Sequence, residues 1–233
     1  MTTIAIMQPY LLPYVGYFQL MAAVDKFVVL DDVHYINRGW INRNRLLVNG
    51  AAHRFTVPLL GASQNRLIYE LQIADEPAWR DRLVQTFLQA YSRAQCRIAI
   101  EPILRRIIHF PTAQLDSFIV NSLREIAGYL SLKVLIEESS RIYQNRHLKA
   151  QDRILDICRQ EGADCYVNPI GGTELYDAEV FAKQGISLKF LQSRPMQYSQ
   201  GRAAYVAGLS IIDVLMFNEP GPTRDLLTRF DLG

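Results

Sequence analysis

Two adjacent carboxylates and a histidine form the part of this sequence best suited to proton transfer. Asp31 and Asp32 end an apolar run, and His34 follows shortly after them. A carboxylate or an imidazole in such a place can act as a general base or bind an amine. We therefore take Asp31, Asp32 and His34 as candidate catalytic residues, and the sequence leaves open which of them accepts a proton. The structural alternatives are a helix cap, a salt bridge and a solvated surface histidine.

A second polar cluster has residue types suited to anion binding. Asn42 and Asn44 flank Arg43, whose planar guanidinium suits two parallel hydrogen bonds to a carboxylate or a phosphate. Trp40 offers a face for stacking. Trp40, Asn42, Arg43 and Asn44 are therefore candidate substrate-binding residues. The alternative is a solvated hairpin strand whose amides satisfy the backbone of a turn.

Two further segments combine polar side chains with an unusual backbone, which prolines stiffen in the first segment and glycines make flexible in the second. Gln8, Tyr10 and Tyr14 lie in a loop stiffened by two prolines, and a helix start with free N–H groups follows at Gly16. Asn168 precedes Gly171 and Gly172, which let backbone N–H groups approach a ligand closely. We add these six residues to the candidate binding set. Tight connections that serve only the fold are the alternative at both places.

The elements that must position these residues follow from hydrophobic periodicity. Thr3–Met7 and Lys26–Leu30 are predicted as buried strands, with a helix at Val15–Val24 between them, which makes a βαβ unit. Asn49-Gly50 between two β-prone runs predicts a hairpin of 45–48 and 53–57. Apolar and mostly polar residues alternate over Leu67–Ile73, which predicts a half-buried strand. The other predicted elements are helices at 77–90, 98–108, 115–130, 148–160, 177–184 and 210–217, and strands at 133–136, 165–168 and 186–191.

Together these elements predict an α/β fold with a mostly parallel sheet flanked by helices, an N-terminal βαβ unit, a β-hairpin and a helical middle segment. We expect one domain over residues 1–233, in which the helical segment at about 76–130 is an insertion or one flank of the sheet. Ligands of parallel sheets bind at the carboxyl ends of the strands. Gln8 and Asp31 each follow a predicted strand and Asn168 ends one, so they should meet at one edge.

Composition, charge and cysteine count limit the classes of protein to which this chain can belong. Hydrophobic residues make up 49% and charged residues 21% of the 233 residues, values that are typical of folded soluble proteins. The three cysteines have no paired spacing, so we expect a reducing compartment and no metal site. A net charge of +2 implies no nucleic-acid partner. No segment is apolar enough to span a membrane and no signal peptide is apparent, so we expect a cytoplasmic protein.

Several segments along the chain resemble the WbqC-like family. They are Ile6–Tyr10 with Pro13-Tyr14 and Gly16–Phe18, Phe27–Asp32, Gly39–Asn44, Tyr166–Gly172 with Leu175-Tyr176, Tyr198–Gln200, and Leu209–Asn218. The resemblance implies a bacterial protein of a polysaccharide or O-antigen (lipopolysaccharide) cluster, or of a related biosynthetic cluster, that transfers glycine or another aminoacyl group to an amino sugar. An amide would fit position 34 as readily as His34 does, which weakens any scheme in which that histidine is indispensable.

These inferences lead to one functional hypothesis and two rivals. The hypothesis is an N-acyltransferase that moves an amino acid or small acyl group from an activated thioester to the amine of a nucleotide-linked sugar. The donor would be a coenzyme A thioester or a loaded acyl or peptidyl carrier protein, with no other cofactor. The first rival is a nucleotide-binding enzyme of the nucleotidyltransferase type, although Gly16-Tyr17-Phe18 lacks the histidine pair of that class. The second rival is a non-catalytic binding protein of the same cluster.

Overall fold

A six-stranded sheet lies at the centre of the computed structural model, which describes residues 1–74, 76, 78–201 and 204–233. Its strand order is β10-β9-β8-β1-β2-β7, and every neighbouring pair is parallel except β9 with β10. The predicted fold class is therefore confirmed. The sheet strands are β1 (Thr3–Met7), β2 (Lys26–Val29), β7 (Leu135–Glu137), β8 (Cys165–Pro169), β9 (Ser187–Ser193) and β10 (Phe230–Leu232).

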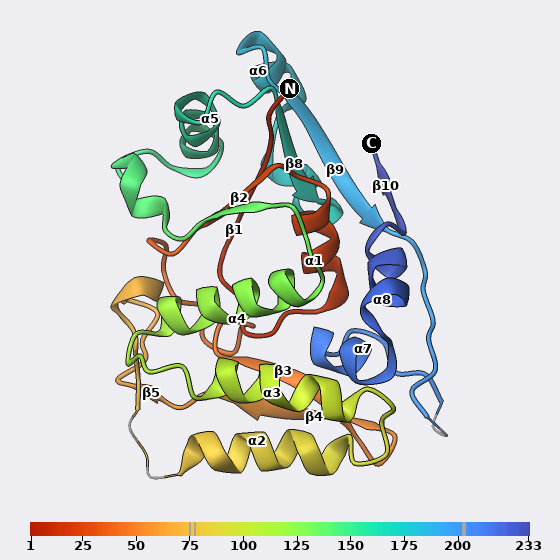
Figure 1. Cartoon of the computed structure of the whole chain (residues 1–233). Coiled ribbons are helices and arrows are strands. Elements are labelled where there is room, and N and C mark those ends of the chain that lie inside the picture. The colour runs from red at the N-terminus through yellow and green to blue at the C-terminus, as the bar shows by residue number, and fades with distance from the viewer. Residues whose placement is uncertain (75, 77, 202–203) are drawn as a thin grey trace.

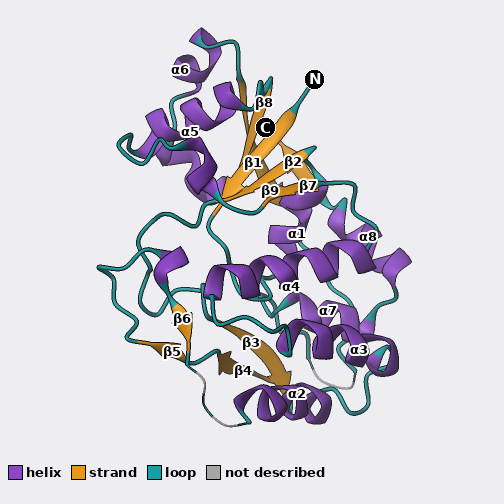
Figure 2. Cartoon of the chain, turned by 60° about the vertical axis from the view of Figure 1, so that its left-hand side comes forward, coloured by secondary structure: helices purple, strands orange, loops and turns teal. Residues whose placement is uncertain are grey.

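Helices cover both faces of the sheet because its strands are apolar on both sides. Ile4 and Ile6 of β1 pack with α5 (Ala150–Gln160) and α6 (Ala178–Lys183), whereas Ala5, which points the other way, packs with α1 (Val15–Ala22) and α8 (Pro220–Leu227). Figure 2 shows these two helix pairs on opposite sides of the sheet. The chain from β1 through α1 to β2 is the predicted βαβ unit.

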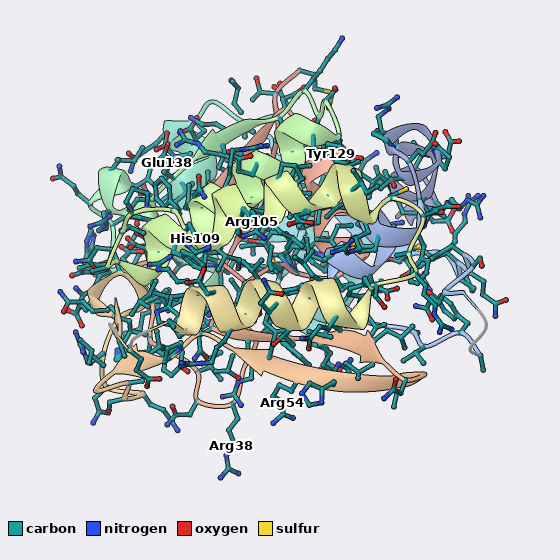
Figure 3. The ribbon with its side chains drawn as sticks, turned by 60° about the horizontal axis from the view of Figure 1, so that its bottom comes forward. Arg38, Arg54, Arg105, His109, Tyr129 and Glu138 are labelled. Carbon is teal, nitrogen blue, oxygen red and sulfur yellow. The ribbon has the colours of Figure 1, made fainter. Side chains whose placement is uncertain are left out.

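Residues 30–134 leave the sheet after β2 and return at β7. They contain the hairpin β3 (Arg43–Val48) and β4 (Ala51–Thr56), the pair β5 (Leu59–Leu60) and β6 (Gln72–Ile73), and helices α2 (Trp79–Ala90), α3 (Arg97–Ile108) and α4 (Leu115–Tyr129). Figure 1 shows the hairpin, α2 and α3 below the sheet, on the side to which β1 runs. His109, at the end of α3 and labelled in Figure 3, has its Nε2 3.3 Å from Oδ1 of Asp81 on α2.

The hairpin turn is tighter than the sequence predicted. Asn49 and Gly50 both have positive φ, 50° and 79°, so they form a two-residue turn of the kind that Asn-Gly favours. Consequently β4 begins at Ala51, and β3 extends back to Arg43. This places Arg43 and Asn44 in a strand, where alternate side chains point to opposite faces.

Three other predictions need correction or qualification. The half-buried strand at Leu67–Ile73 is wrong for most of its length, because Ile68–Glu70 form a 3-10 turn, with Leu67 N–H bonded to the Glu70 carboxylate. No element was predicted after 210–217, but Pro220, a proline at a first helical position, begins α8, and β10 follows it. Residue 77, in the predicted helix at 77–90, lies outside the described residues.

The remaining elements connect the sheet strands. They are the 3-10 turns η2 (Ser140–Tyr143) and η3 (Ile170–Leu175) and helix α7 (Ile211–Phe217). Among the described residues, no helix combines the length and the apolar character needed to cross a membrane.

A buried ion pair fixes α5 against the end of β2. Arg153 of α5 and Asp32 are both almost completely buried, and the Arg153 guanidinium bonds Asp32 and, at 3.0 Å, the Asn145 side chain. We expect Arg153→Met to lower the free energy of unfolding by about 3 kcal/mol or more, since it leaves an uncompensated buried carboxylate. Urea unfolding followed by circular dichroism measures this change.

The matched control is Arg159→Met on the same helix, because Arg159 is exposed. It should change stability by less than about 1 kcal/mol. Equal losses in the two variants would contradict the importance of the buried pair.

Candidate functional site

The carboxyl ends of the parallel strands form the edge from which the candidate site is built. Met7 of β1 aligns with Val29 of β2, and continuing the registers places Pro169 of β8 beside the end of β1. The sheet order changes direction between β1 and β8, because β2 lies on one side of β1 and β8 on the other. Ligands of doubly wound sheets bind in the crevice outside such a switch point.

The first loop, residues 8–14, leaves β1 at this switch point. The Tyr17 hydroxyl donates to the Gln8 carbonyl at 2.9 Å, and burial raises the pKa of Tyr17 well above its usual value. Tyr10 lies against the Tyr17 ring, with 5.8 Å between centroids, whereas Tyr14 is 43% exposed. Within the described chain, the Gln8 side-chain amide has no hydrogen-bond partner, so it is available at the edge.

The hairpin holds one side of the first loop. The Asn44 side-chain amide donates to the carbonyls of Leu11 at 3.0 Å and Leu12 at 2.9 Å, and Leu11 N–H donates to the Trp40 carbonyl at 3.2 Å. Leu12 has a φ of 42°, a left-handed conformation that costs energy for a leucine and persists only where its surroundings impose it. Asn44 is therefore an anchor for the loop.

Helix α7 holds the other side. The Ser210 hydroxyl donates to the Leu12 carbonyl, and Ile211 N–H donates to the Pro13 carbonyl, both at 2.8 Å. Ser210 also caps α7 by accepting from Ile212 N–H, and its own N–H donates to the Arg45 carbonyl. The loop is thus fixed between β3 and the start of α7, while its side chains at positions 8, 10 and 14 make few polar contacts.

The start of α1 is crowded by the loop. A Cβ on Gly16 would lie 2.4 Å from the Tyr14 ring and 3.1 Å from the Ser193 hydroxyl at the end of β9. A side chain at position 16 would therefore have to displace the Tyr14 ring and press on Ser193. The same contacts bring Tyr14 and Ser193 together at the sheet edge.

Two arginines project from the same face of β3. Arg43 and Arg45 are two residues apart in the strand, so their side chains point the same way. Both Nε atoms are buried, and neither has a hydrogen-bond partner among the described residues. The Arg45 guanidinium also lies 5.2 Å from the Trp40 ring centroid and donates to the Gly208 carbonyl at 3.0 Å. Neither arginine forms an ion pair with a carboxylate of the described chain.

The amide of Asn42 has its partners inside the protein. Its Nδ2 donates to the Val57 carbonyl at 2.9 Å, and its Oδ1 accepts from the Tyr35 hydroxyl at 2.8 Å. Two members of the cluster predicted from Trp40 to Asn44 remain able to bind a ligand. They are Arg43, whose Nε has no partner among the described residues, and the Trp40 ring, which is 40% exposed.

The two carboxylates after β2 lie in a buried polar network. Ser139 donates to both oxygens of Asp31, at 2.9 and 2.8 Å, and Arg141 Nε lies 3.2 Å from the same carboxylate. Burial raises the pKa of Asp31, although Ser139 and Arg141 act in the opposite direction. Asp32 accepts from Ser140 and pairs with Arg153. The two neighbouring aspartates therefore have different surroundings.

His34 lies apart from this network. Its ring is exposed, its Nδ1 is 3.2 Å from the Gln64 carbonyl, and its backbone forms a bridge with Leu67. The contacts described for His34 include neither aspartate.

The turn after β8 is closely packed at one glycine and open at the other. Asn168 is buried, and its Oδ1 accepts from the Tyr166 hydroxyl at 3.2 Å. A Cβ on Gly172 would lie 1.9 Å from Asn168 Nδ2, whereas a Cβ on Gly171 would meet nothing within 4 Å. Gly172 therefore lets Asn168 keep its place at the edge, and Gly171 faces open space.

Sequence analysis did not select Arg45 as a candidate, and it treated Ser210 only as a helix start. The spacing of Arg43 and Arg45 could have indicated their shared face once β3 was extended to Arg43. Among the described residues, no group of three or more metal-ligating side chains is close enough to hold an ion.

The close packing at Gly172 generates a stability prediction. Gly172→Ala should force the Asn168 amide away from Tyr166 and cost about 1 kcal/mol, the value of one hydrogen bond. Gly171→Ala should be neutral or slightly stabilising, since alanine restricts the unfolded chain. Thermal or urea unfolding of both variants checks the difference, and equal stabilities would contradict the packing argument.

Comparison with known proteins gives a family and one relative. The model of the WbqC-like protein family matches residues 8–225. The chain is also 27% identical over 232 residues to a protein of Mycobacterium tuberculosis (strain ATCC 25618 / H37Rv) described as "Uncharacterized protein Rv1507c", covering 97% of this chain and 98% of the relative. No solved structure matches the chain.

Proposed function

This chain belongs to the WbqC-like protein family, and on that premise we propose that it is an N-acyltransferase whose acceptor is a nucleotide-linked amino sugar. The donor is a thioester of coenzyme A or of a carrier protein, and the group transferred is an amino acid such as glycine or another small acyl group. The reaction belongs to the biosynthesis of a bacterial surface polysaccharide and takes place in the cytoplasm.

The observation that carries the proposal is the pair of arginines on β3. A buried N–H without a partner costs about 1–3 kcal/mol, so such a group is normally satisfied by a water, an ion or a ligand. Arg43 and Arg45 offer two of them on one strand face, with Trp40 beside Arg45. Guanidinium groups with no paired carboxylate suit a diphosphate, and the indole ring offers a surface for a base or a sugar.

The first loop supplies the second part of the proposed site. Asn44 holds the loop to the strand that carries both arginines. Although Asn44 points from the opposite face of β3, Arg45 bonds the Gly208 carbonyl, two residues before Ser210, which holds the Leu12 carbonyl. We therefore place the sugar of a diphosphate bound at Arg43 and Arg45 near the first loop, where Gln8, Tyr10 and Tyr14 present their side chains. The amides of Asn42 and Asn44 have internal partners, which leaves the Gln8 amide as the donor that we assign to the developing oxyanion.

We assign proton removal to Asp31 rather than to Asp32 or His34. Its raised pKa makes it a better proton acceptor than an ordinary aspartate, and the half-buried Ser139 hydroxyl connects it toward solvent. The acceptor amine attacks the thioester carbonyl, the C–N bond forms and the C–S bond breaks. One amine proton passes through Ser139 to Asp31 and then to the departing thiolate.

A second candidate function is nucleotidyl transfer, which the order of the strands favours. The order β7-β2-β1-β8-β9 follows the doubly wound arrangement that binds nucleotides at its switch point. Against it stands the start of α1, where Gly16-Tyr17-Phe18 offers no histidine.

The direct test uses the purified chain with acetyl- or glycyl-thioesters and UDP- or dTDP-linked amino sugars. Mass spectrometry should detect the amide product together with one equivalent of free thiol. Release of pyrophosphate from ATP or CTP with Mg²⁺, without amide formation, would favour the second candidate. Binding of the nucleotide sugar with neither reaction would instead favour a non-catalytic binding protein.

Substitution of the unpaired arginine tests the acceptor site. Arg43→Gln should raise the KM for the nucleotide sugar about tenfold or more, the scale of one charge-assisted contact. The KM for the thioester should not change. Arg159→Gln, an exposed arginine on α5, is the matched control and should match the wild-type chain. Unchanged kinetics in Arg43→Gln would remove β3 from the acceptor site.

A further inference from the structure

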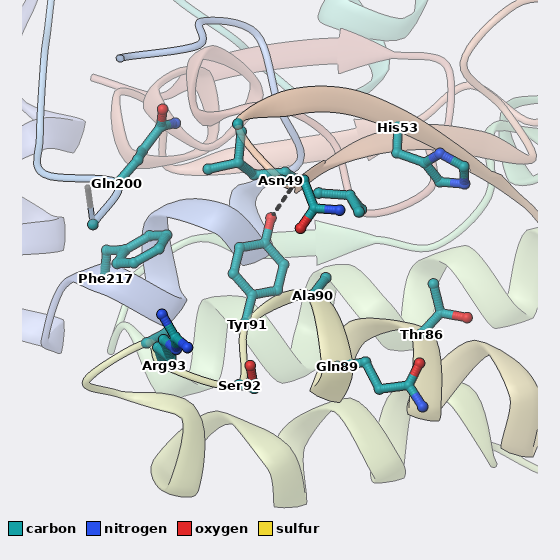
Figure 4. A pocket seen from close by; sticks show the side chains of 15 residues that line it. Asn49, His53, Thr86, Gln89, Ala90, Tyr91, Ser92, Arg93, Gln200 and Phe217 are labelled. Atoms are coloured by element: carbon teal, nitrogen blue, oxygen red, sulfur yellow. Dashed lines mark hydrogen bonds between the residues drawn. The ribbon is translucent and has the colours of Figure 1, made fainter. Parts of the chain in front are cut away.

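The hairpin is a fixed platform with one face toward α2 and the other face outward. Phe55 of β4 packs edge-on against Phe87 of α2, with 4.9 Å between ring centroids. The hydroxyl of Tyr91, which follows α2, accepts from Leu47 N–H at 3.0 Å, the bond drawn in Figure 4. Side chains alternate along a strand, so Arg54, the neighbour of Phe55, belongs to the outward face.

The outward face places two positive charges directly opposite each other. Arg54 of β4 is the register partner of Arg45 of β3, so their side chains share this face, and like charges in such a pair destabilise a sheet. Among the described residues, Arg54 has no hydrogen-bond or ion-pair partner. Glu76, which lines a hollow beside β4 together with Arg54, lies 3.9 Å from Arg82. An acidic partner would therefore relieve a repulsion that the chain itself does not relieve.

The same charge bias extends through the sequence around the hairpin. Residues 33–69 contain five arginines and no lysine, aspartate or glutamate, whereas the rest of the chain has 20 basic and 23 acidic side chains. The small net charge of the whole chain thus conceals one strongly positive segment. Such a segment attracts an anionic partner and speeds its association.

The turn before the hairpin adds exposed apolar surface to this charge. Ile36 is 51% exposed and Trp40 is 40% exposed, with the exposed Arg38 between them in the sequence. The Trp40 ring lies 5.2 Å from the Arg45 guanidinium, so the turn adjoins the outward face of the hairpin. Figure 3 shows the side chains of Arg38 and Arg54 projecting outward, away from α2.

This combination of residues is typical of a surface that binds another protein. Arginine and tryptophan are enriched at protein–protein interfaces, whereas lysine and carboxylates are depleted there. Exposed arginines beside apolar side chains suit the acidic surface of a protein. By contrast, the Nε atoms of Arg43 and Arg45 are buried, which suits a small anion. The hairpin therefore offers one place for a phosphate ligand and another for an acidic protein.

We propose that Ile36, Arg38, Trp40 and Arg54 form a docking face for an acidic carrier protein that brings the thioester donor. This inference rests on the proposed function and narrows its donor from two classes to the carrier protein. Leu11 N–H donates to the Trp40 carbonyl at 3.2 Å, so the docking face adjoins the first loop. The flexible arm of a docked carrier extends from there along the first loop to the sheet edge.

Charge reversal at an exposed arginine tests docking apart from chemistry. The purified chain receives glycine as a thioester on an acidic peptidyl carrier protein or as glycyl-pantetheine, which has the same arm without the protein. Arg54→Glu should lower kcat/KM with the loaded carrier about tenfold or more, the scale of one interfacial charge contact. It should leave kcat/KM with glycyl-pantetheine unchanged. Raising the ionic strength to about 1 M should slow only the carrier reaction.

A second variant, a control and a binding measurement complete the test. Arg38→Glu should reproduce the effect of Arg54→Glu. Arg159→Glu reverses an exposed charge on α5, away from the hairpin, and should match the wild-type chain with both donors. Fluorescence anisotropy of a holo-carrier labelled on its arm measures docking without turnover. Its Kd should rise about tenfold or more in both hairpin variants.

The inference is overturned if both hairpin variants leave carrier binding and carrier turnover unchanged, or if they slow glycyl-pantetheine as much as the carrier. It is also overturned if the wild-type chain binds no holo-carrier, or if a short duplex DNA binds in its place and loses affinity in the same variants. Amide formation that neither variant affects would refute the docking face alone. Charge-dependent carrier binding without amide formation from either donor would support the docking face and count against the proposed function.

Discussion

Groups on the hairpin and on α7 donate hydrogen bonds to the carbonyl groups of the loop that leaves β1. The arrangement of residues around the sheet edge depends on these bonds. Buried backbone groups must find partners, and a proline-rich loop cannot pair with a strand or form a helix. Asn44, Ser210 and Ile211 supply those partners for Leu11, Leu12 and Pro13. One short loop thereby joins the sheet to the hairpin and to α7, elements far apart in the sequence (Figure 1).

Charge is distributed unequally on the two sides of this loop. After β2, the carboxylates of Asp31 and Asp32 are paired with Arg141 and Arg153 in a buried network. On β3, Arg43 and Arg45 have no paired carboxylate in the described chain. The pairs compensate the charges of the buried aspartates, whereas the unpaired arginines leave positive charge for an anionic ligand. This difference underlies our assignment of the phosphates to β3.

Strands β1, β2, β7, β8 and β9 were predictable because they are short, largely apolar runs between helices with clear apolar stripes. The three-residue edge strand β10 was not predicted. The strand-exit rule also selected Gln8, Asp31 and Asn168 correctly as neighbours of one edge, as the strand registers imply. Partners that lie far apart in sequence were not predictable. Asn44 and Asn42 have polar side chains that suit a ligand, and only the fold reveals that their amides bond backbone carbonyls. Likewise, the sequence does not reveal that the carboxylate of Asp213 in α7 accepts a hydrogen bond from the hydroxyl of Tyr91, which is distant in the chain. The strand prediction for Leu67–Ile73 was wrong because its alternating residues fall in a 3-10 turn that Glu70 closes onto Leu67.

A crystal structure of the chain soaked with a UDP- or dTDP-linked amino sugar tests the central claim most directly. The account predicts electron density for the diphosphate within hydrogen-bonding distance of Arg43 and Arg45, with the base or sugar against Trp40 and the amine directed toward Gln8 and Ser139. Density for the nucleotide sugar elsewhere, with Arg43 still unpaired, would contradict the proposed site.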